Sequence, residues 1–361
     1  MKATNMRYFG GWMVVLVLVL TTVARTATDA NSMTVAPDGS GDYKTLQDAI
    51  AAAPDSSSEP IIIHIKPGTY AGPFIVPKSK ANIQLIGDDA STCILTWDRN
   101  AHDPIPTGVD GFNPGLQVAG DDFLAAHLTI QNTSGDHGQA LALRVDGDRD
   151  VFVDCKITGW QDTVMANTGR DYFQGCYIAG RVDFIYGSAA AWFANCEIHS
   201  RNGGHVTAAS TAQDQPYGYV FVNCKLTGDK IPFNPATTNP SSTAKPKVTP
   251  LADLGRPWRA YASVTYINCE MGDHITPAGW NDWHRVSNHS TARYSEYHST
   301  GPGGSPAGRV PWSHQLTDDQ AKAITIQAVL ARGDNWDPES VAAPYIRAPT
   351  IEPATMPTTM P

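Results

Sequence analysis

The sequence has few charged residues, no basic run and no recognisable metal-binding pattern. Only 17% of its 361 residues are Asp, Glu, Lys or Arg, and the formal net charge is −9. Without a basic patch, or aromatic residues interleaved with basic ones, nucleic acid is not an expected partner. No His, Cys, Asp and Glu residues have metal-ligand spacing, so no metal site is expected. An acidic chain also has no overall attraction for a polyanion, so an acidic substrate would depend on local Arg and Lys side chains.

Long apolar segments are also absent, with one exception at the start of the chain. Lys2 and Arg7 precede an apolar stretch at residues 11–23, and small residues follow. This order is typical of a secretory signal peptide, here residues 1–30, with cleavage at residues 26–30. The stretch is short for a membrane span, so an uncleaved anchor is the weaker interpretation. We therefore expect a secreted, extracellular protein with no membrane association after signal cleavage.

A short pattern recurs in the middle of the chain. It consists of an aromatic residue, any residue, a small or turn-forming residue, Cys, any residue and Ile. The pattern occurs at residues 152–157, 173–178 and 193–198, and looser copies lie at 221–226 and 266–271. An earlier copy at 123–128 has Ala126 in the Cys position. A fixed period near 20 residues is typical of a stacked array of coils.

Each repeat is too short to bury an apolar face by itself, but stacked neighbours can bury it together. The aromatic, Cys and Ile positions alternate with the period of a strand, and Asn, Asp or Gly before the Cys favours a turn. The pattern therefore predicts an all-β fold, a parallel β-helix (solenoid) with interior ladders of Phe, Cys and Ile. A single solenoid accounts for the length of the chain.

Cysteine is scarce, and its placement argues against a disulfide framework. Six cysteines in an exported chain would first suggest disulfides. However, Cys155, Cys176, Cys196, Cys224 and Cys269 share one position of the repeat. We interpret these five as buried thiols that pack as small hydrophobic side chains. Cys93 has no assigned role, and a bridge between adjacent coils stays an open alternative.

The repeat also brings two aspartates into register. Asp162 follows Cys155 by seven residues, and Asp183 follows Cys176 by the same number. On neighbouring coils they would lie about 4.8 Å apart at the backbone. Two charges at about 5 Å repel by roughly 3 kcal/mol at an effective dielectric of 20, which corresponds to about two pKa units. One carboxyl should therefore keep a proton near neutral pH while the other is ionised. The alternative is a pair of solvated loop aspartates.

Helices are expected only at the ends and outside of the solenoid. Residues 45–53 are typical of a short amphipathic helix that caps the first coil. Thr317 and Gln320 form a capping-box pattern that predicts a helix continuing to about Leu330. The domain is expected to span residues 31–341, and the Pro- and Thr-rich tail at 342–361 is expected to be disordered.

Five short motifs resemble one enzyme family. In chain order they are Gly68–Tyr70, Gln139–Leu143, Gln161–Thr163, Asp183–Gly187 and Leu254–Trp258. Together they make the chain similar to the pectin methylesterases, also called pectinesterases, over roughly residues 33–340. The resemblance implies a right-handed parallel β-helix with short capping helices. It also implies an ester hydrolase that acts on methyl-esterified homogalacturonan (pectin), yields pectate and methanol, and needs no cofactor. We expect a monomer.

The resemblance also implies a role for each matching residue. Asp183 would be the nucleophile and Asp162 the acid and then the base. Gln161 and Gln139 would be the oxyanion donors, and Arg256 the orienting cation. Substrate contacts would come from Trp258, Tyr186, Gln139 and Arg256.

The sequence departs from the family pattern at several positions. Gly72 replaces a frequent Glu, Val164 replaces Leu, and Tyr186 replaces Phe; residues 206–210 lack the usual Gln and Gly. These differences concern the shape of the cleft more than the reaction.

Other functions fit parts of the sequence. Carboxylates about 5 Å apart would suit a retaining glycosidase acting on polygalacturonate. Paired amides beside the aspartates argue against that reaction, and a lyase would need an acidic cluster suited to calcium, which the sequence lacks. A binding protein that uses the solenoid face without catalysis, and a thioesterase-like relative, are further alternatives.

Overall fold

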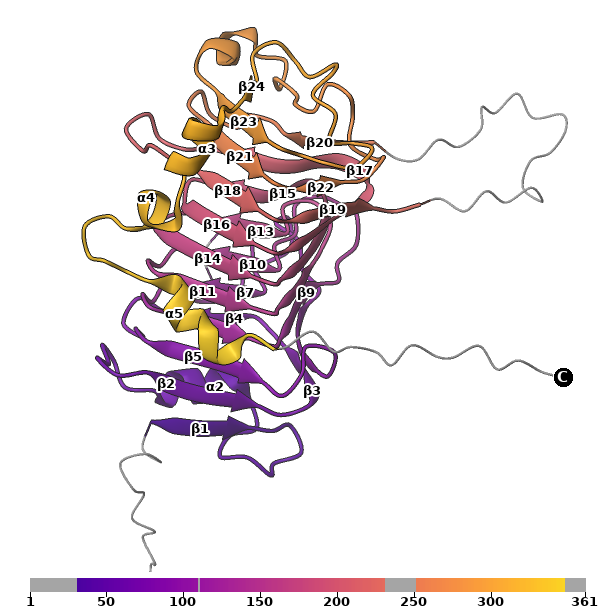
Figure 1. The fold of residues 1–361 in the computed structure, drawn as a ribbon. Coiled ribbons are helices and arrows are strands. Elements are labelled where there is room, and N and C mark those ends of the chain that lie inside the picture. The colour runs from indigo at the N-terminus through magenta and orange to yellow at the C-terminus, as the bar shows by residue number, and fades with distance from the viewer. Residues whose placement is uncertain (1–30, 110, 231–250, 348–361) are drawn as a thin grey trace, which may run out of the picture.

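Parallel strands stacked coil upon coil form the body of the protein (Figure 1). The computed structural model describes residues 31–109, 111–230 and 251–347. The first sheet, along one face, consists of β1 (Ser32–Val35), β2 (Ile61–Ile65), β5 (Ile83–Gly87), β8 (Leu124–Ala126), β11 (Asp150–Val153), β14 (Arg170–Gln174), β16 (Ala190–Ala194), β18 (Tyr219–Val222), β21 (Ser263–Ile267), β23 (Arg293–Tyr297) and β24 (His314–Gln315). Every neighbouring pair in this sheet is parallel.

Two further rows of strands complete the coils. The second row contains β3 (Gly68–Ala71), β6 (Cys93–Trp97), β9 (Thr129–Asn132), β12 (Lys156–Thr158), the first parts of β15 (Tyr177–Gly187) and β17 (Glu197–Ala209), β19 (Lys225–Gly228) and β22 (Glu270–Met271). The third row contains β4 (Phe74–Val76), β7 (Leu116–Val118), β10 (Leu143–Val145), β13 (Val164–Ala166), the last parts of β15 and β17, and β20 (Ala252–Gly255). Their pairs are also parallel, so the expected parallel β-helix is confirmed.

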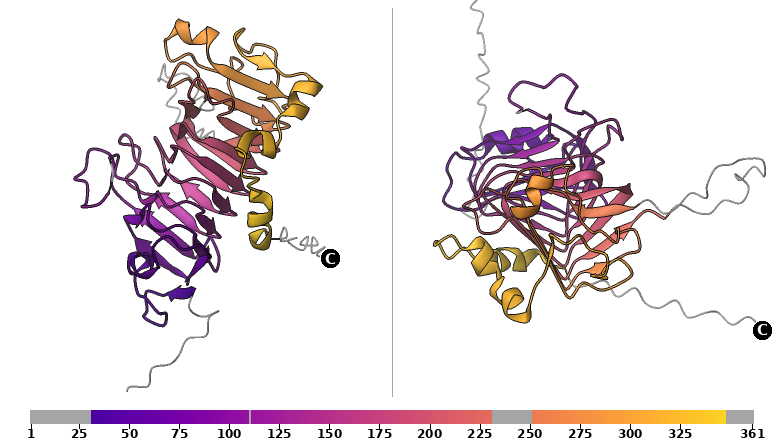
Figure 2. Two further views of the ribbon diagram at one scale, coloured as in Figure 1. Left: turned by 90° about the vertical axis from the view of Figure 1, so that its left-hand side faces the viewer. Right: turned by 90° about the horizontal axis from the view of Figure 1, so that it is seen from above.

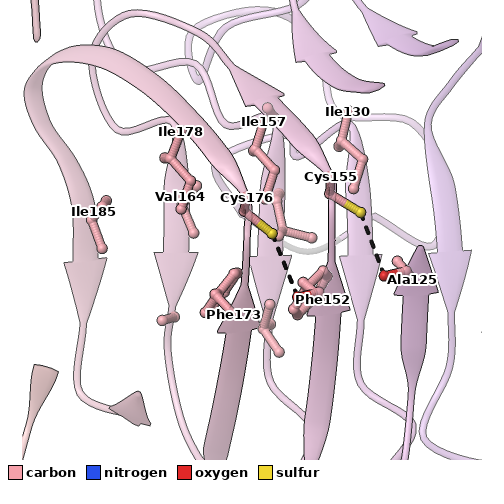
Figure 3. Packing of buried hydrophobic residues seen from close by; sticks show 14 of the residues in the cluster. Ala125, Ile130, Phe152, Cys155, Ile157, Val164, Phe173, Cys176, Ile178 and Ile185 are labelled. Atoms are coloured by element: carbon pink, nitrogen blue, oxygen red, sulfur yellow. Dashed lines mark hydrogen bonds between the residues drawn. The ribbon is translucent and has the colours of Figure 1, made fainter. Parts of the chain in front are cut away.

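The aromatic position of the repeat forms a stacked interior ladder. Phe152, Phe173, Phe193, Phe221 and Tyr266 lie opposite one another on successive coils. Their ring centroids are 4.4–4.7 Å apart and their planes differ by 9–12°. Figure 3 shows Phe152 and Phe173 beneath the Cys and Ile positions of the same coils. The stacking distance is close to the spacing of the strands themselves, so backbone pairing and ring packing support each other.

The sequence pattern predicts a turn before each cysteine, and the residue at this position has a left-handed conformation. The five turn residues are Asp154, Gly175, Asn195, Asn223 and Asn268, with φ between 48° and 64°. Gly, Asn and Asp are the residues that tolerate this region best. All six cysteines, Cys93 included, are buried free thiols. The predicted thiol ladder is therefore confirmed, and no bridge joins adjacent coils.

The earliest copy of the repeat was placed two residues too early. β8 pairs Ala125, not Phe123, with Phe152, and the left-handed turn residue is His127. Leu128 therefore occupies the position assigned to Ala126. A strand repeats its faces every two residues, so an apolar segment without the cysteine fits either register by pattern alone.

Short helices cover one end and one face of the solenoid. α2 (Leu46–Ala52) contacts β1, β2 and β4, and the Thr45 side chain accepts a hydrogen bond from the Asp48 amide, so the predicted capping helix is confirmed. The predicted capping box at Thr317 is also present, at the start of α3 (Asp318–Ala323). This helix ends before Leu330, because Thr325 is extended and caps a separate helix, α4 (Ile326–Leu330). The short 3₁₀ helix η2 spans Val286–Ser290.

The C-terminal segment is ordered beyond the point at which disorder was expected. α5 (Pro338–Ala342) and the 3₁₀ helix η3 (Ala343–Tyr345) lie along the first sheet (Figures 1 and 2). The Tyr345 hydroxyl donates to Gln84 at 2.8 Å, and Arg347 lies 3.2 Å from Asp89. Because these contacts hold residues 342–347 in place, the prediction that disorder begins at residue 342 was wrong. Residues 348–361 and the expected signal peptide, 1–30, lie outside the described residues.

The helices bury the outward apolar side chains of the first sheet. This cluster contains Leu124, Val151, Val153, Tyr172, Trp192, Val329, Leu330 and Ala342, among others. The side chains of β11 are therefore buried on both faces of the sheet, as is typical of parallel sheets. Among the described residues, no helix has the length and apolar character that crossing a bilayer requires.

The interior ladder predicts a large loss of stability when one ring is removed. Phe173 is fully buried between Phe152, at 4.7 Å, and Phe193, at 4.6 Å. Phe173→Ala should lower the free energy of unfolding by about 3–5 kcal/mol, measured by urea denaturation. Val286, which is 72% exposed, provides the control, since Val286→Ala should change it by less than about 0.5 kcal/mol. Equal effects of the two substitutions would contradict a packed ladder.

Candidate active site

The two aspartates predicted to be in register lie on neighbouring coils of the third row. β13 and β15 pair Val164 with Ile185, which places Asp162 and Asp183 at equivalent positions two residues earlier. The Asp162 amide donates to the Val182 carbonyl at 3.0 Å. One coil earlier, Gln139 pairs with Gln161 in an isolated parallel bridge. The stacking of coils therefore brings two amides and two carboxyls to one place on the surface.

Both aspartates have an unusual backbone conformation. The φ angle is +62° at Asp162 and +52° at Asp183. This region is sparsely populated by residues other than Gly, and Asp and Asn enter it more readily than most. The two residues occupy equivalent positions on neighbouring coils, Asp162 just before β13 and Asp183 within β15, and the surrounding strands hold this backbone conformation in place.

Arg256 distinguishes the two carboxyls. Its Nε lies 2.8 Å from Oδ1 of Asp183 and its Nη2 lies 2.7 Å from Oδ2, which is a bidentate ion pair. The guanidinium carbon is 3.8 Å from the ring centroid of Trp283, so a cation–π contact also stabilises the position of Arg256. Asp183 is 5% exposed. A bidentate pair of this kind belongs to the strongest class of charge-assisted hydrogen bonds.

Asp162 has a different environment. Burial raises its pKa to about 7, and the charge of Asp183 contributes in the same direction. Gln139 donates to Oδ2 of Asp162 at 2.9 Å, and this hydrogen bond, the charge of Arg256 and the Gln161 amide lower the pKa in part. Asp162 therefore carries a proton for much of the time near neutral pH, whereas Asp183 is the partner of the Arg256 guanidinium. Spacing alone predicted that one carboxyl of the pair keeps a proton, but it did not predict which one.

All seven residues singled out from the sequence line one cavity of about 150 Å³. They are Gln139, Gln161, Asp162, Asp183, Tyr186, Arg256 and Trp258. Tyr186 and Trp258 contact edge to face, with centroids 5.8 Å apart. Burial raises the pKa of Tyr186 well above its ordinary value, and its hydroxyl has no hydrogen-bond partner among the described residues.

Sequence reasoning missed three residues that line the cavity, namely Phe112, Ala208 and Trp283. Trp280 is buried in the core against Tyr294, whereas Trp283, three residues later in the same loop, lines the cavity. The segment that precedes β7 carries Phe112 to the cavity.

A larger cavity of about 460 Å³ lies elsewhere, between α4 and the turn at residues 214–217. It contains Asp214 and Arg332 but no pair of carboxyls, so it offers no comparable chemistry. The described residues contain no group of three or more His, Cys, Asp or Glu side chains arranged to hold a metal ion.

Comparison with known proteins decides the family. The family model described as Pectinesterase matches residues 32–334. Pectinesterase 31 of Arabidopsis thaliana is 36% identical over 297 residues, which cover 80% of this chain and 88% of that protein. The chain belongs to the pectinesterase family. This confirms the resemblance that the five motifs indicated.

Longer pectinesterases and solved structures give the same result. A pectinesterase/pectinesterase inhibitor of Brassica campestris is 37% identical over 295 residues, covering 77% of this chain but 48% of that protein. The chain thus spans about half the length of that relative. Pectin methylesterase from carrot has a TM-score of 0.74 and 35% identity, covering 83% of this chain and 93% of the carrot chain. A pectin methylesterase mutant solved with a hexasaccharide has a TM-score of 0.67 and 29% identity, covering 84% and 97%.

The site predicts opposite pKa changes at Asp162 for two substitutions. Gln139→Leu removes a donor to the carboxylate, so the pKa of Asp162 should rise above about 7. Asp183→Asn removes the neighbouring negative charge, so the pKa should fall. A carboxyl-carbon NMR titration of labelled aspartate measures both changes. Changes in one direction only, or an ordinary pKa in the parent protein, would contradict the described environment.

Proposed function

We propose that the protein removes methyl esters from homogalacturonan, converting pectin and water to pectate and methanol. The observation that carries this proposal is the pairing of an Arg-bound carboxylate, Asp183, with a buried carboxyl, Asp162, whose pKa is about 7. Ester hydrolysis needs a nucleophile, a proton donor for the alkoxide and donors for the oxyanion. Family membership supports the assignment of these roles.

In the first half-reaction, the Asp183 carboxylate attacks the ester carbonyl carbon. The developing oxyanion accepts hydrogen bonds from the side-chain amides of Gln161 and Gln139. Gln139 uses one N–H on Asp162 in the free protein, and its second N–H is available for this purpose. Each such donor contributes about 3 kcal/mol in comparable sites. The C–O bond to the methoxy group then breaks, and Asp162 gives its proton to form methanol.

In the second half-reaction, water resolves the acid anhydride between Asp183 and the substrate. Asp162, now a carboxylate, accepts a proton from water as the oxygen attacks the substrate acyl carbon. The anhydride breaks, Asp183 leaves as a carboxylate, and the galacturonate carboxyl is released. Asp162 is protonated again, so both residues return to their initial states.

Aromatic residues and Arg256 complete the substrate site. Trp258 and Tyr186 offer a ring edge and face beside the aspartates, and aromatic faces suit pyranose rings. Arg256 and Gln139 lie within the same cavity, so each can touch both a catalytic carboxyl and the substrate. We further propose that the protein is exported through residues 1–30, acts outside the cell on pectin, and works as a monomer.

A single assay separates this function from its alternatives. Highly methylated pectin should release methanol without any change in chain length or gain of unsaturated ends. Shortened chains would instead indicate a glycosidase or lyase, and the absence of products would indicate a binding protein or a thioesterase-like enzyme. Asp183→Asn should reduce methanol release by about 10⁴-fold or more, because the nucleophile is lost. Asp214→Asn, which changes an exposed carboxyl at the distant cavity, is the matched control and should retain full activity.

The proton on Asp162 predicts the direction of the pH dependence. The first half-reaction needs protonated Asp162, and the protonated fraction falls tenfold per pH unit above the pKa. The value of kcat/KM should therefore fall at pH above about 7 with a slope of one proton. Asp162→Asn should lower kcat by about 10²–10⁴-fold and remove this limb from the profile. Near-full activity of this variant would refute the role of Asp162.

A further inference from the structure

A second pair of aspartates lies inside the solenoid, in the first sheet. Asp150 begins β11 and Asp171 lies in β14, where β-pairing places them directly opposite each other. Each precedes an inward phenylalanine, Phe152 or Phe173, by two residues, so both share the inward face of the first sheet. Both aspartates are 0% exposed.

These carboxyls have almost no hydrogen-bond partners. Oδ1 of Asp150 accepts a hydrogen bond from the Phe123 amide at 3.0 Å. The other oxygen of Asp150 and both oxygens of Asp171 have no partner among the described residues. An ionised carboxylate in such a place is very unfavourable, and two of them one strand spacing apart are more so.

Nearby charges do not neutralise the pair. The groups whose charges act on it are Asp121 and Asp122 before β8, Asp146 and Asp148 before β11, and Arg332 after α4; Tyr219 of β18 in turn responds to Asp171. Arg332 is the one cation in this set, against four further aspartates. Arg149 and Arg170 lie at the same edge but are occupied by Asp122, Asp148 and Asp334.

We propose that Asp150 and Asp171 form a proton-binding carboxyl pair inside the coil, which stabilises the fold in acid and weakens it as rising pH forces the pair to ionise. A carboxylic acid is both a donor and an acceptor, so a protonated pair can satisfy the oxygens that lack partners. The described residues offer two facing carboxyls at this place and no third metal-binding side chain, so the proton is favoured over a metal ion.

The direction of the pH effect follows from linkage. Burial raises the pKa of both groups well above the ordinary value, and neighbouring aspartates act in the same direction. In the unfolded chain each titrates at about 3.9. Below that pH both states hold the protons and the stabilisation is complete. As pH rises towards the folded-state pKa, the unfolded state loses its protons first, so the equilibrium moves towards unfolding.

Isosteric substitution tests this effect. Asp171→Asn keeps the shape of the side chain but cannot ionise. Relative to the parent protein, it should raise the ratio of folded to unfolded molecules by about tenfold or more at pH 8, with little change at pH 4. The measurement is the urea unfolding midpoint at each pH. An equal shift at both pH values, or a loss of stability at pH 8 alone, would overturn the proposal.

Asp334 provides a matched control with the opposite sign. Its hydrogen bonds to Arg170 lower its pKa, so its ionised form stabilises the folded state. Asp334→Asn should therefore lower the unfolding midpoint at pH 8 and have less effect in acid. If both substitutions shifted the midpoint in one direction at pH 8, the change would reflect a general loss of negative charge rather than the buried pair.

A spectroscopic test remains decisive if Asp171→Asn does not fold. In the Asp162→Asn variant, whose active-site carboxyl no longer titrates, the folded protein at pH 7 should show the infrared carbonyl band of a protonated carboxylic acid. Unfolding in urea at the same pH should abolish this band. Absence of the band in the folded protein would overturn the proposal. A band that disappears when calcium chloride is added, with a rise in unfolding midpoint, would assign the pair to a cation instead.

Discussion

Register between successive coils is the constraint on which the rest of the structure depends. Parallel backbone pairing fixes each residue opposite its counterpart about 4.8 Å away. The same pairing stacks the phenylalanine rings, aligns the buried thiols and brings Asp162 beside Asp183. A slip of one residue between two coils would turn the interior side chains of one coil outward, which is very unfavourable. The packing of the core therefore also fixes the relative position of Asp162 and Asp183. The parallel pairing between coils thus determines both the packing of the core and the arrangement of the candidate active site.

Stacking makes the two active-site aspartates equivalent, and residues from other coils make them different. Arg256 reaches Asp183 from 73 residues further along the chain, whereas Asp162 accepts a hydrogen bond from the Gln139 amide of the preceding coil. Asp183 is therefore ion-paired with a guanidinium, whereas Asp162 retains a proton for much of the time near neutral pH. Asp150 and Asp171 also lie in register, but within the part of the chain that the structure describes no cation is bound to either. The same register thus places one carboxyl pair beside a guanidinium and amides, and the other in the interior, where we propose that it binds protons.

The sequence predicted those features of the fold and the site that depend on the period of the repeat. The parallel β-helix, the thiol ladder and the pairing of Asp162 with Asp183 all follow from spacing. The distant partner of Asp183 did not, because spacing says nothing about which loop returns to a given coil, and Arg256 came from resemblance. Trp280 and Trp283 could not be distinguished, since a loop has no fixed period. Asp150 and Asp171 did carry a signal, because each lies two residues before an inward Phe.

Composition was a poor guide to where the ordered structure ends, because residues 342–347 are anchored although disorder was expected from residue 342 onward. The segment from α3 to Arg347 leaves the last coils, runs back along the first sheet and reaches Gln84 and Asp89 near the first coils (Figures 1 and 2). In an open array each coil contacts only its neighbours, so the ends can fray independently. Here the C-terminal segment connects the last coils to β5, with α4 against β16 and α5 against β11 on the way. The coils between β5 and β23 therefore cannot separate from one another without also breaking contacts of this segment, so it acts as a tie across most of the stack.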